Sequence, residues 1–125
     1  MKRFVFWTGG LDLLMGLAAV VSTLFAAPTA SFHLVFVIGG FLMFCGAALM
    51  WASQDLANRG PVVFWQGLVR LMAVGGNLYA VQAGLADSSL YGATVLDAVI
   101  GPIYLIGITR LLGVAPHRVF LGKTS

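Results

Sequence analysis

Five polar side chains able to hold or move charge lie inside long apolar stretches of this chain: Asp12, Arg70, Asn77, Asp97 and Tyr104. An ionisable group in a hydrocarbon environment is costly, so it has a partner or lines a water-filled cavity. These residue types suit a structural ion-pair network, a pathway for a proton or cation, or a pocket for an anionic headgroup. We favour the structural network, because such pairs fix the register of packed helices.

The spacing of these residues predicts which of them meet. Counting about 1.5 Å per residue from Arg3 and from Pro61 places Asp12 and Arg70 each roughly 13 Å from the same side. Opposite charges at matched depth predict an ion pair between Asp12 and Arg70. The same counting predicts a hydrogen bond between Asp97 and Asn77, and puts Tyr104 within reach of the long Arg70 side chain.

The composition indicates the solvent in which these residues lie. Hydrophobic residues make up 60% of the 125-residue chain and charged residues only 9%, against about 25% charged in ordinary soluble domains. A soluble fold of this size could not bury so much apolar surface. The net charge of +3 does not indicate nucleic-acid binding, because the basic residues are dispersed at segment ends.

Four apolar segments are long enough to cross a bilayer, and they predict an all-α membrane protein, a four-helix transmembrane bundle in a single domain of residues 1–125. The predicted spans are residues 4–26, 34–52, 61–84 and 93–112, followed by a tail at 113–125 that is poorly ordered toward its end. A basic start and an apolar run are also typical of a cleaved signal peptide. Asp12 and the full length of the first run favour a retained helix.

The basic residues predict the orientation of these spans. With four crossings, one side carries Lys2, Arg3, Arg59, Arg118 and Lys123. The two turns on the other side contain no lysine or arginine, so both ends of the chain are predicted to be cytoplasmic, N-in and C-in. The predicted location is the cytoplasmic (inner) membrane, with several passes.

Small residues form stripes that would let helix backbones approach closely. The first span carries Gly9, Asp12, Gly16, Ala19 and Thr23 on one face, and the second carries Gly39, Met43, Gly46 and Met50. Paired glycines recur along the chain but do not by themselves predict an internal duplication, because glycine is frequent in membrane helices. Between the second and third spans, Asp55 and Arg59 predict either a short helix with an i, i+4 pair or a solvated loop.

Signatures of common catalytic and cofactor sites are absent from the sequence. There is no Walker A, dinucleotide-binding, HExxH or GxSxG pattern, and the single Cys45 rules out an intrachain disulfide or a CxxC site. His33 and His117 are predicted at opposite ends of the bundle, where they could not ligate one metal or haem. We predict no catalytic residue, metal or cofactor.

The order of these features resembles a group of small bacterial four-helix membrane proteins that are DoxX-like. The matching segments are LDLLMG with Asp12, the glycine-rich second span ending in WASQD, GLVR with Arg70, and LDAVIGPIY with Asp97. The resemblance implies the four-helix architecture. It also implies a link to quinol oxidation and redox complexes, for which this chain supplies no redox centre.

The sequence predicts two alternative functions. The first is a non-enzymatic accessory or self-associating membrane component, with the lipid bilayer and a larger membrane complex or further copies of the chain as partners. The alternative is a small carrier or pocket protein that handles a proton, cation, quinone or lipid through the intramembrane polar cluster. Small multidrug exporters also place an acidic residue in their first helix, but pairing with Arg70 would tend to keep Asp12 ionised.

Overall fold

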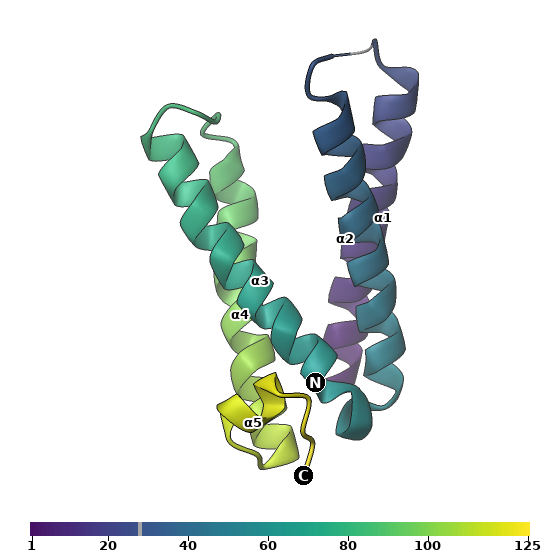
Figure 1. Ribbon diagram of the computed structural model, residues 1–125, viewed down its shortest axis with the longest axis vertical. Helices are drawn as coiled ribbons and strands as arrows, with labels where there is room; N and C mark the ends of the chain where they lie inside the picture. The colour runs from purple at the N-terminus through teal and green to yellow at the C-terminus, as the bar shows by residue number, and fades with distance from the viewer. Residues whose placement is uncertain (28) are drawn as a thin grey trace. The chain divides into compact units, whose positions relative to one another are not determined.

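The computed structural model describes residues 1–27 and 29–125, and the regular secondary structure in these ranges is entirely helical (Figure 1). The helices are α1 (Lys2–Phe25), α2 (Phe32–Gln54), α3 (Leu56–Gln82), α4 (Leu90–Leu112) and α5 (Pro116–Phe120). The predicted all-α class is therefore confirmed. The predicted turn at residues 27–31 includes Pro28, which lies outside the described residues.

Among the described residues, three helices are long and apolar enough to cross a membrane: α1, α2 and α4. The third predicted span is also helical over most of its length. However, α3 carries Gln66, Arg70 and Asn77 as well as a polar first turn, and this lowers its mean hydropathy. In a bilayer, α3 would therefore depend more than the other long helices on a neighbour that can satisfy its polar groups.

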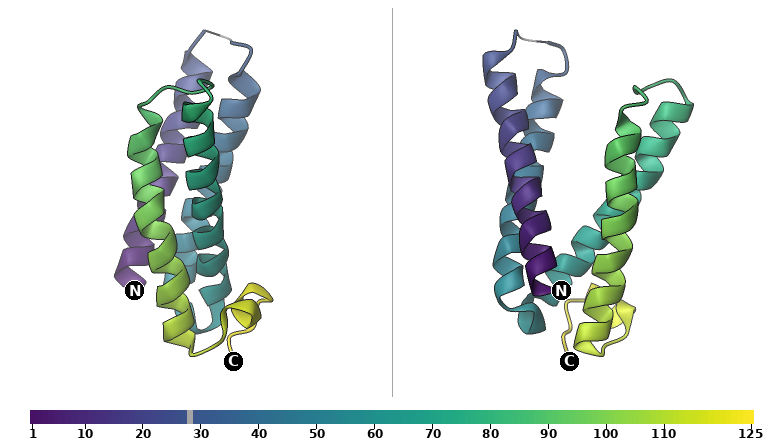
Figure 2. Two further views of the ribbon diagram at one scale, coloured as in Figure 1. Left: turned by 90° about the vertical axis from the view of Figure 1, so that its left-hand side faces the viewer. Right: turned by 180° about the vertical axis from the view of Figure 1, so that it is seen from behind.

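The chain divides into two compact units, Met1–Asp55 and Leu56–Ser125. Each contains one long helical hairpin, α1 with α2 and α3 with α4 (Figure 2). Asp55, with φ −144° and ψ 75°, is the only residue between α2 and α3. Of the two alternatives predicted around Asp55 and Arg59, the helix is the one observed, because Leu56 already starts α3 and buries its side chain.

In the first unit, α1 and α2 pack through the predicted small-residue stripes. A Cβ added to Gly9 would lie 2.8 Å from the carbonyl oxygen of Gly46, and one added to Gly16 would lie 2.5 Å from the carbonyl oxygen of Gly39. Such separations are too short for real atoms, so these positions accept only glycine at this helix distance. The predicted glycine faces of α1 and α2 are confirmed.

In the second unit, α3 and α4 meet at one pair of glycines. A Cβ on Gly67 would lie 3.1 Å from the carbonyl oxygen of Gly101, and one on Gly101 would lie 3.2 Å from that of Gly67. Nearer the start of α3, a Cβ on Gly60 would lie 3.0 Å from a methyl carbon of Leu112. The two backbones are therefore close over the first half of α3.

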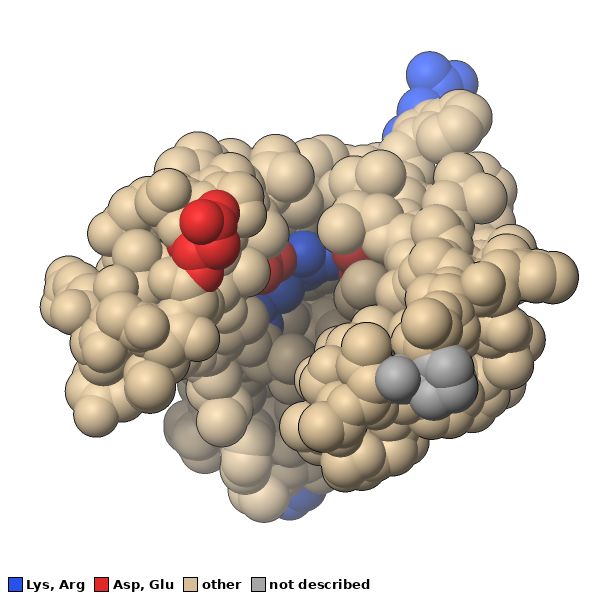
Figure 3. Space-filling model, turned by 90° about the horizontal axis from the view of Figure 1, so that it is seen from above, with Lys and Arg blue, Asp and Glu red and all other residues tan. Residues whose placement is uncertain are grey.

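The turn between α3 and α4 is built from local hydrogen bonds. Gly84 adopts φ +70°, and the backbone N–H groups of Gly84 and Leu85 donate to the carbonyls of Val81 and Ala80, which is the usual glycine-terminated end of a helix. Asp87 follows, and its carboxylate accepts a hydrogen bond of 2.8 Å from the backbone N–H of Ser89. Figure 3 shows an exposed acidic group on a surface that is otherwise mostly uncharged.

The tail folds back onto the second unit, where the sequence predicted a poorly ordered end. Gly113, with φ +64°, terminates α4, and Pro116 starts the short helix α5. The indole N–H of Trp65 on α3 donates to the carbonyl oxygen of Phe120 over 3.0 Å, and Val119 is fully buried. One aliphatic side chain and one hydrogen bond to α3 thus anchor the tail.

The glycine contacts predict different responses from two glycines on α2. Gly46→Ala should destabilise the first unit by ~1–3 kcal/mol, because the added methyl group would collide with the backbones of Gly9 and Leu13. Gly40→Ala is the matched control, since a Cβ there meets nothing within 4 Å, and should be neutral or slightly stabilising. Thermal unfolding in detergent measures both, and equal effects would contradict the close packing.

The Asp87 turn predicts a pH dependence. The backbone hydrogen bond from Ser89 is the main cause that lowers the pKa of Asp87 below its ordinary value of 3.8, helped by the Ser89 hydroxyl and the Ser88 backbone and weakly opposed by desolvation. Because the folded pKa is depressed, the turn's contribution to stability is full above the ordinary pKa. It is lost as the pH falls through the folded pKa.

An NMR titration of the Asp87 carboxyl group in detergent checks this dependence. Ser89→Ala should move the pKa of Asp87 part of the way back toward its ordinary value, since the hydroxyl contact is lost and the backbone contact remains. Ser88→Ala is the control, because Ser88 acts through its backbone. An unchanged midpoint in the Ser89 variant would contradict the assigned cause.

Candidate functional site

Arg70 on α3 and Asp97 on α4 form an ion pair inside the second unit. Arg70 Nη1 donates to Asp97 Oδ1 over 2.5 Å, and the two side chains are 11% and 18% exposed. A hydrogen bond between two charged groups is short and strong, and in apolar surroundings it compensates for part of the cost of burying both charges.

The glycine crossing explains why this pair forms. Arg70 lies one turn after Gly67, and its Cβ would be 3.4 Å from a Cβ built on Gly101. The Arg70 side chain therefore starts directly over Gly101. Asp97 and Tyr104 stand one turn before and one turn after Gly101 on the same face of α4, so the guanidinium has a partner on each side.

Tyr104 supplies the second contact. The guanidinium carbon of Arg70 lies 5.6 Å from the centroid of the Tyr104 ring, and Tyr104 is fully buried. An aromatic face attracts a cation at this range, more strongly where water is excluded. The predicted approach of Tyr104 to Arg70 is thus observed, and we name Arg70, Asp97 and Tyr104 the arginine cluster.

The structure gives Asp97 a different partner from the predicted Asn77. Asn77 lies one heptad beyond Arg70 on α3 and is half-buried. Among the described residues, the hydrogen bond recorded for the Asp97 carboxylate is from Arg70 rather than from Asn77. The depth count missed this because the Arg70 side chain starts beside Gly101 and is long enough to reach Asp97, one turn before that glycine on α4.

Asp12 lies in the first unit. It is 5% exposed and stands on α1 between Gly9 and Gly16, the two glycines that contact α2. The predicted ion pair between Asp12 and Arg70 would join the two units, and it stays a prediction. What the structure adds is that both charges are buried.

A short internal repeat relates these two positions and was not predicted from the sequence. Residues 5–13 read VFWTGGLDL and residues 63–71 read VFWQGLVRL, with Val, Phe, Trp, Gly and Leu at matching places. In this alignment Asp12 corresponds to Arg70. The signal that could have revealed it is the Phe-Trp pair, since the chain has only 3 tryptophans and two of them fall at the same place in the repeat.

The matching positions of the repeat have matching surroundings. Val5 and Val63 are both fully buried. Gly9 and Gly67 both face a glycine carbonyl of the other helix of their hairpin, Gly46 and Gly101 respectively. In each hairpin a buried charge follows the contact glycine by one turn, and the two charges have opposite signs.

Other chemistry-bearing residues do not gather into a site in the part of the chain that is described. No group of three or more His, Cys, Asp or Glu side chains there is arranged to hold a metal ion. His33 is the second residue of α2 in the first unit, whereas His117 lies in α5 of the second. Cys45 is a half-buried thiol on α2.

Comparisons with models of protein families, with curated proteins and with solved structures find no match. The arginine cluster is thus the feature whose chemistry can be assigned. It holds a cation between a carboxylate and an aromatic ring, and it joins α3 to α4 beside their glycine contact.

The ion pair predicts strong coupling between Arg70 and Asp97. Arg70→Met or Asp97→Leu alone should cost ~3–5 kcal/mol, because each leaves one charge in apolar surroundings. The double variant should cost clearly less than the sum of the two, with a coupling of ~0.5–3 kcal/mol.

Unfolding free energies in detergent measure this coupling. Arg70→Met combined with Asp87→Asn is the control, since Asp87 lies in the turn and should add independently. Additive losses for Arg70 and Asp97 would show that the contact does not contribute to stability.

Proposed function

We propose that this chain is an integral membrane protein that crosses the bilayer four times as a helical bundle, N-in and C-in. Three helices with the length and composition of membrane spans support this. The partnering of α3 with α4 through the arginine cluster supports a fourth crossing, because it compensates Arg70, the charged group among those that lower the hydropathy of α3. The distribution of lysine and arginine supports the orientation.

Cysteine accessibility in intact cells tests the topology. In a Cys45→Ala background, a membrane-impermeant reagent should label cysteines placed at Ser31 and Ser88 from outside. It should not label cysteines at Ala57 and Ser125 unless the membrane is opened. Labelling of Ser31 and Ser88 from opposite sides would overturn the four-span arrangement.

We infer that the protein is a non-enzymatic membrane component, either an accessory subunit or a self-associating bundle. The observation that carries this proposal is the contact of Arg70 with both Asp97 and Tyr104. Both of these partners of the guanidinium belong to its own hairpin. Such a cluster fixes the register of α3 against α4, and fixing register is the best-attested role of buried ionic groups.

Apolar side chains on the outward faces of the helices support association. Phe41 and Phe44 on α2 are both 70% exposed, and Met72 on α3 is 76% exposed. In a bilayer these faces meet either acyl chains or another protein. We propose that some of them pack against further copies of the chain or against a larger membrane complex.

Two further parts of the proposal rest on the sequence. The first is the Asp12–Arg70 ion pair, supported by matched depth and by the correspondence of the two positions in the repeat. The second is a relationship to DoxX-like bacterial inner-membrane proteins, supported by the order of Asp12, WASQD, Arg70 and Asp97 along the chain. For the ion pair, removing Arg70 alone should destabilise the protein more than removing Asp12 and Arg70 together.

The alternative function is a small carrier or pocket protein that handles a proton, cation, quinone or lipid. The observation that favours it is the 18% exposure of the Asp97 side chain, which leaves part of this carboxylate open to a ligand. A carrier needs such access, whereas a purely structural lock does not.

Reconstitution into liposomes separates the two functions. We expect no proton or cation flux above that of empty vesicles, and a discrete oligomer or a co-purifying membrane protein when the chain is extracted in native nanodiscs. The control is Asp97→Asn, which removes the charge and keeps the size. Flux that disappears in this variant, from a chain that runs as a monomer without partners, would overturn the proposal in favour of the carrier.

A further inference from the structure

The tail of the second unit turns back along its hairpin instead of continuing away from it. Figures 1 and 2 show α5 beside the last turns of α4. A Cβ on Gly67 of α3 would lie 2.9 Å from Leu105 of α4. Trp65, two residues before Gly67, donates its indole N–H to the carbonyl oxygen of Phe120. Phe120 is therefore level with a part of α4 about two turns, roughly 10 Å, before that helix ends at Leu112.

Local hydrogen bonds give this returning tail a defined structure. Gly122, with φ +80°, follows the end of α5, and its backbone N–H donates to the carbonyl of Val119. The backbone N–H of Lys123 donates to the carbonyl of Arg118, and the two bonds together form the usual left-handed glycine end of a helix. The carbonyl of Phe120 is paired with the indole. Such pairing is what backbone groups require where lipid replaces water.

The tail turns one apolar side chain inward and two outward. Val119 is fully buried, whereas Phe120 is 54% and Leu121 66% exposed. Trp65, which holds the tail, is itself 44% exposed. Neighbouring apolar side chains that stay exposed mark a contact surface. At the level of the last turns of a membrane-spanning helix, that surface meets the boundary between lipid headgroups and acyl chains.

The charges of the tail suit the same location. Residues 113–125 include Arg118 and Lys123 but no aspartate or glutamate. Both basic side chains are exposed, and long basic side chains at an interface lay their apolar stems along lipid while their charged ends stay in water. Tryptophan and basic residues are also the side chains enriched at the cytoplasmic surface of a membrane.

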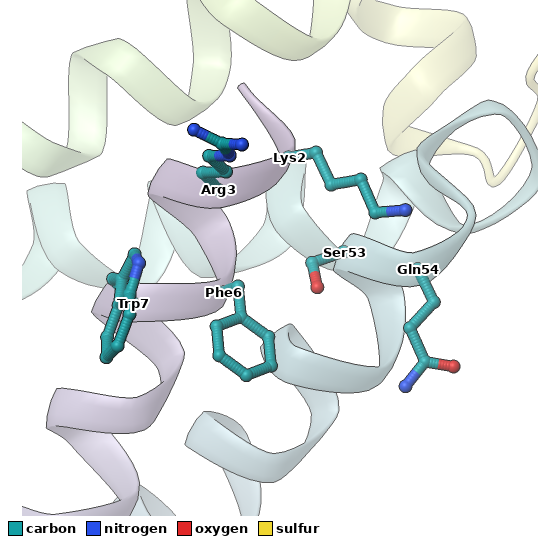
Figure 4. A pocket seen from close by; sticks show the side chains of 6 residues that line it. All are labelled: Lys2, Arg3, Phe6, Trp7, Ser53 and Gln54. Atoms are coloured by element: carbon teal, nitrogen blue, oxygen red, sulfur yellow. The ribbon is translucent and has the colours of Figure 1, made fainter.

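The internal repeat supplies a comparison for the tryptophan. Trp7 takes the place of Trp65 in the first unit and is 72% exposed. Its ring packs edge to face against Phe6, and Figure 4 shows it on α1, apart from Ser53 and Gln54 at the end of α2. Trp7 is therefore a matched control for the contact of Trp65 with the tail.

We propose that residues 113–123 form an interfacial segment that docks on the cytoplasmic leaflet of the bilayer, with Phe120 and Leu121 inserted between headgroups and acyl chains. The partner is the lipid surface, and Trp65 holds the segment at that depth. The inference rests on the proposed four-span topology. It goes beyond that topology, which is equally compatible with a tail that lies free in the cytoplasm.

Fluorescence quenching in liposomes tests the depth of the segment in the full chain. In a Cys45→Ala background, Leu121→Cys and Ser125→Cys are each labelled with an environment-sensitive fluorophore. A nitroxide attached to the lipid just below its headgroup should quench the label at 121 several-fold more strongly than the label at 125. A water-soluble quencher should show the reverse order, because residue 125 lies beyond the docked segment.

Hydrogen exchange of the tail amides in nanodiscs measures what the lipid contact contributes. Phe120→Ser/Leu121→Ser keeps the backbone carbonyl that accepts the indole N–H. It should nevertheless speed the exchange of residues 113–125 by about tenfold, because the apolar contact with lipid is lost. His117→Ser is the control within α5, since it replaces an exposed polar side chain, and it should leave the exchange unchanged.

The same measurement tests the anchor. Trp65→Phe removes the indole donor and should also speed the exchange of the tail, whereas Trp7→Phe should not. Equal effects of the two tryptophan variants would overturn the role of Trp65 in holding the segment.

Two further outcomes would overturn the docking itself. Quenching at 121 that is no stronger than at 125 would place the tail in water, and disulfide cross-linking of unlabelled Leu121→Cys between two chains would assign the surface to a second copy. Cysteines at Ser31 and Ser88 report the topology separately. If they are labelled from the same side while the label at 121 stays in water, the docking fails and the four-span arrangement stands.

Discussion

A guanidinium buried among apolar helices must be matched by groups that compensate for its lost hydration, and the second unit of this protein is arranged around that requirement. Arg70 would make α3 a poor membrane helix on its own. The glycine contact between Gly67 and Gly101 brings α4 close enough for Asp97 and Tyr104 to reach the guanidinium from either side. Close backbone packing and charge compensation therefore depend on each other.

The first unit also places a buried charge beside a glycine contact between helices, but there the charge is a carboxylate. Gly9 and Gly16 bring α1 against α2, and Asp12 is buried between them. The repeat that relates Asp12 to Arg70 gives the two hairpins a common plan, a contact glycine followed one turn later by a buried charge. If two such hairpins pack side by side in a bilayer, charges at equivalent depth and of opposite sign would attract, which is the physical basis for proposing an Asp12–Arg70 pair.

Counting the depth of each residue along its helix predicts contacts that depend only on where two residues lie. It does not predict contacts that depend on how far a long side chain reaches. It placed Tyr104 near Arg70, as observed, but it assigned Asn77 rather than Arg70 to Asp97. The sequence left a short helix and a solvated loop as alternatives around Asp55 and Arg59, and it did not predict the short helix α5 in the tail. Leu56 is a single apolar residue in a largely polar stretch of the sequence and Val119 lies in a short basic tail, and each is buried in the folded chain.

The amino-acid sequence by itself determined that the chain is helical and strongly apolar, and which faces of α1 and α2 carry glycine, because composition and the 3.6-residue period are local properties. Only the tertiary structure decided that Arg70 binds Asp97 and that Trp65 donates a hydrogen bond to the tail. Both depend on the distance and rotation between helices. Those are set by glycines, which have no side chain and therefore show in the sequence where helices can approach but not which groups they bring together.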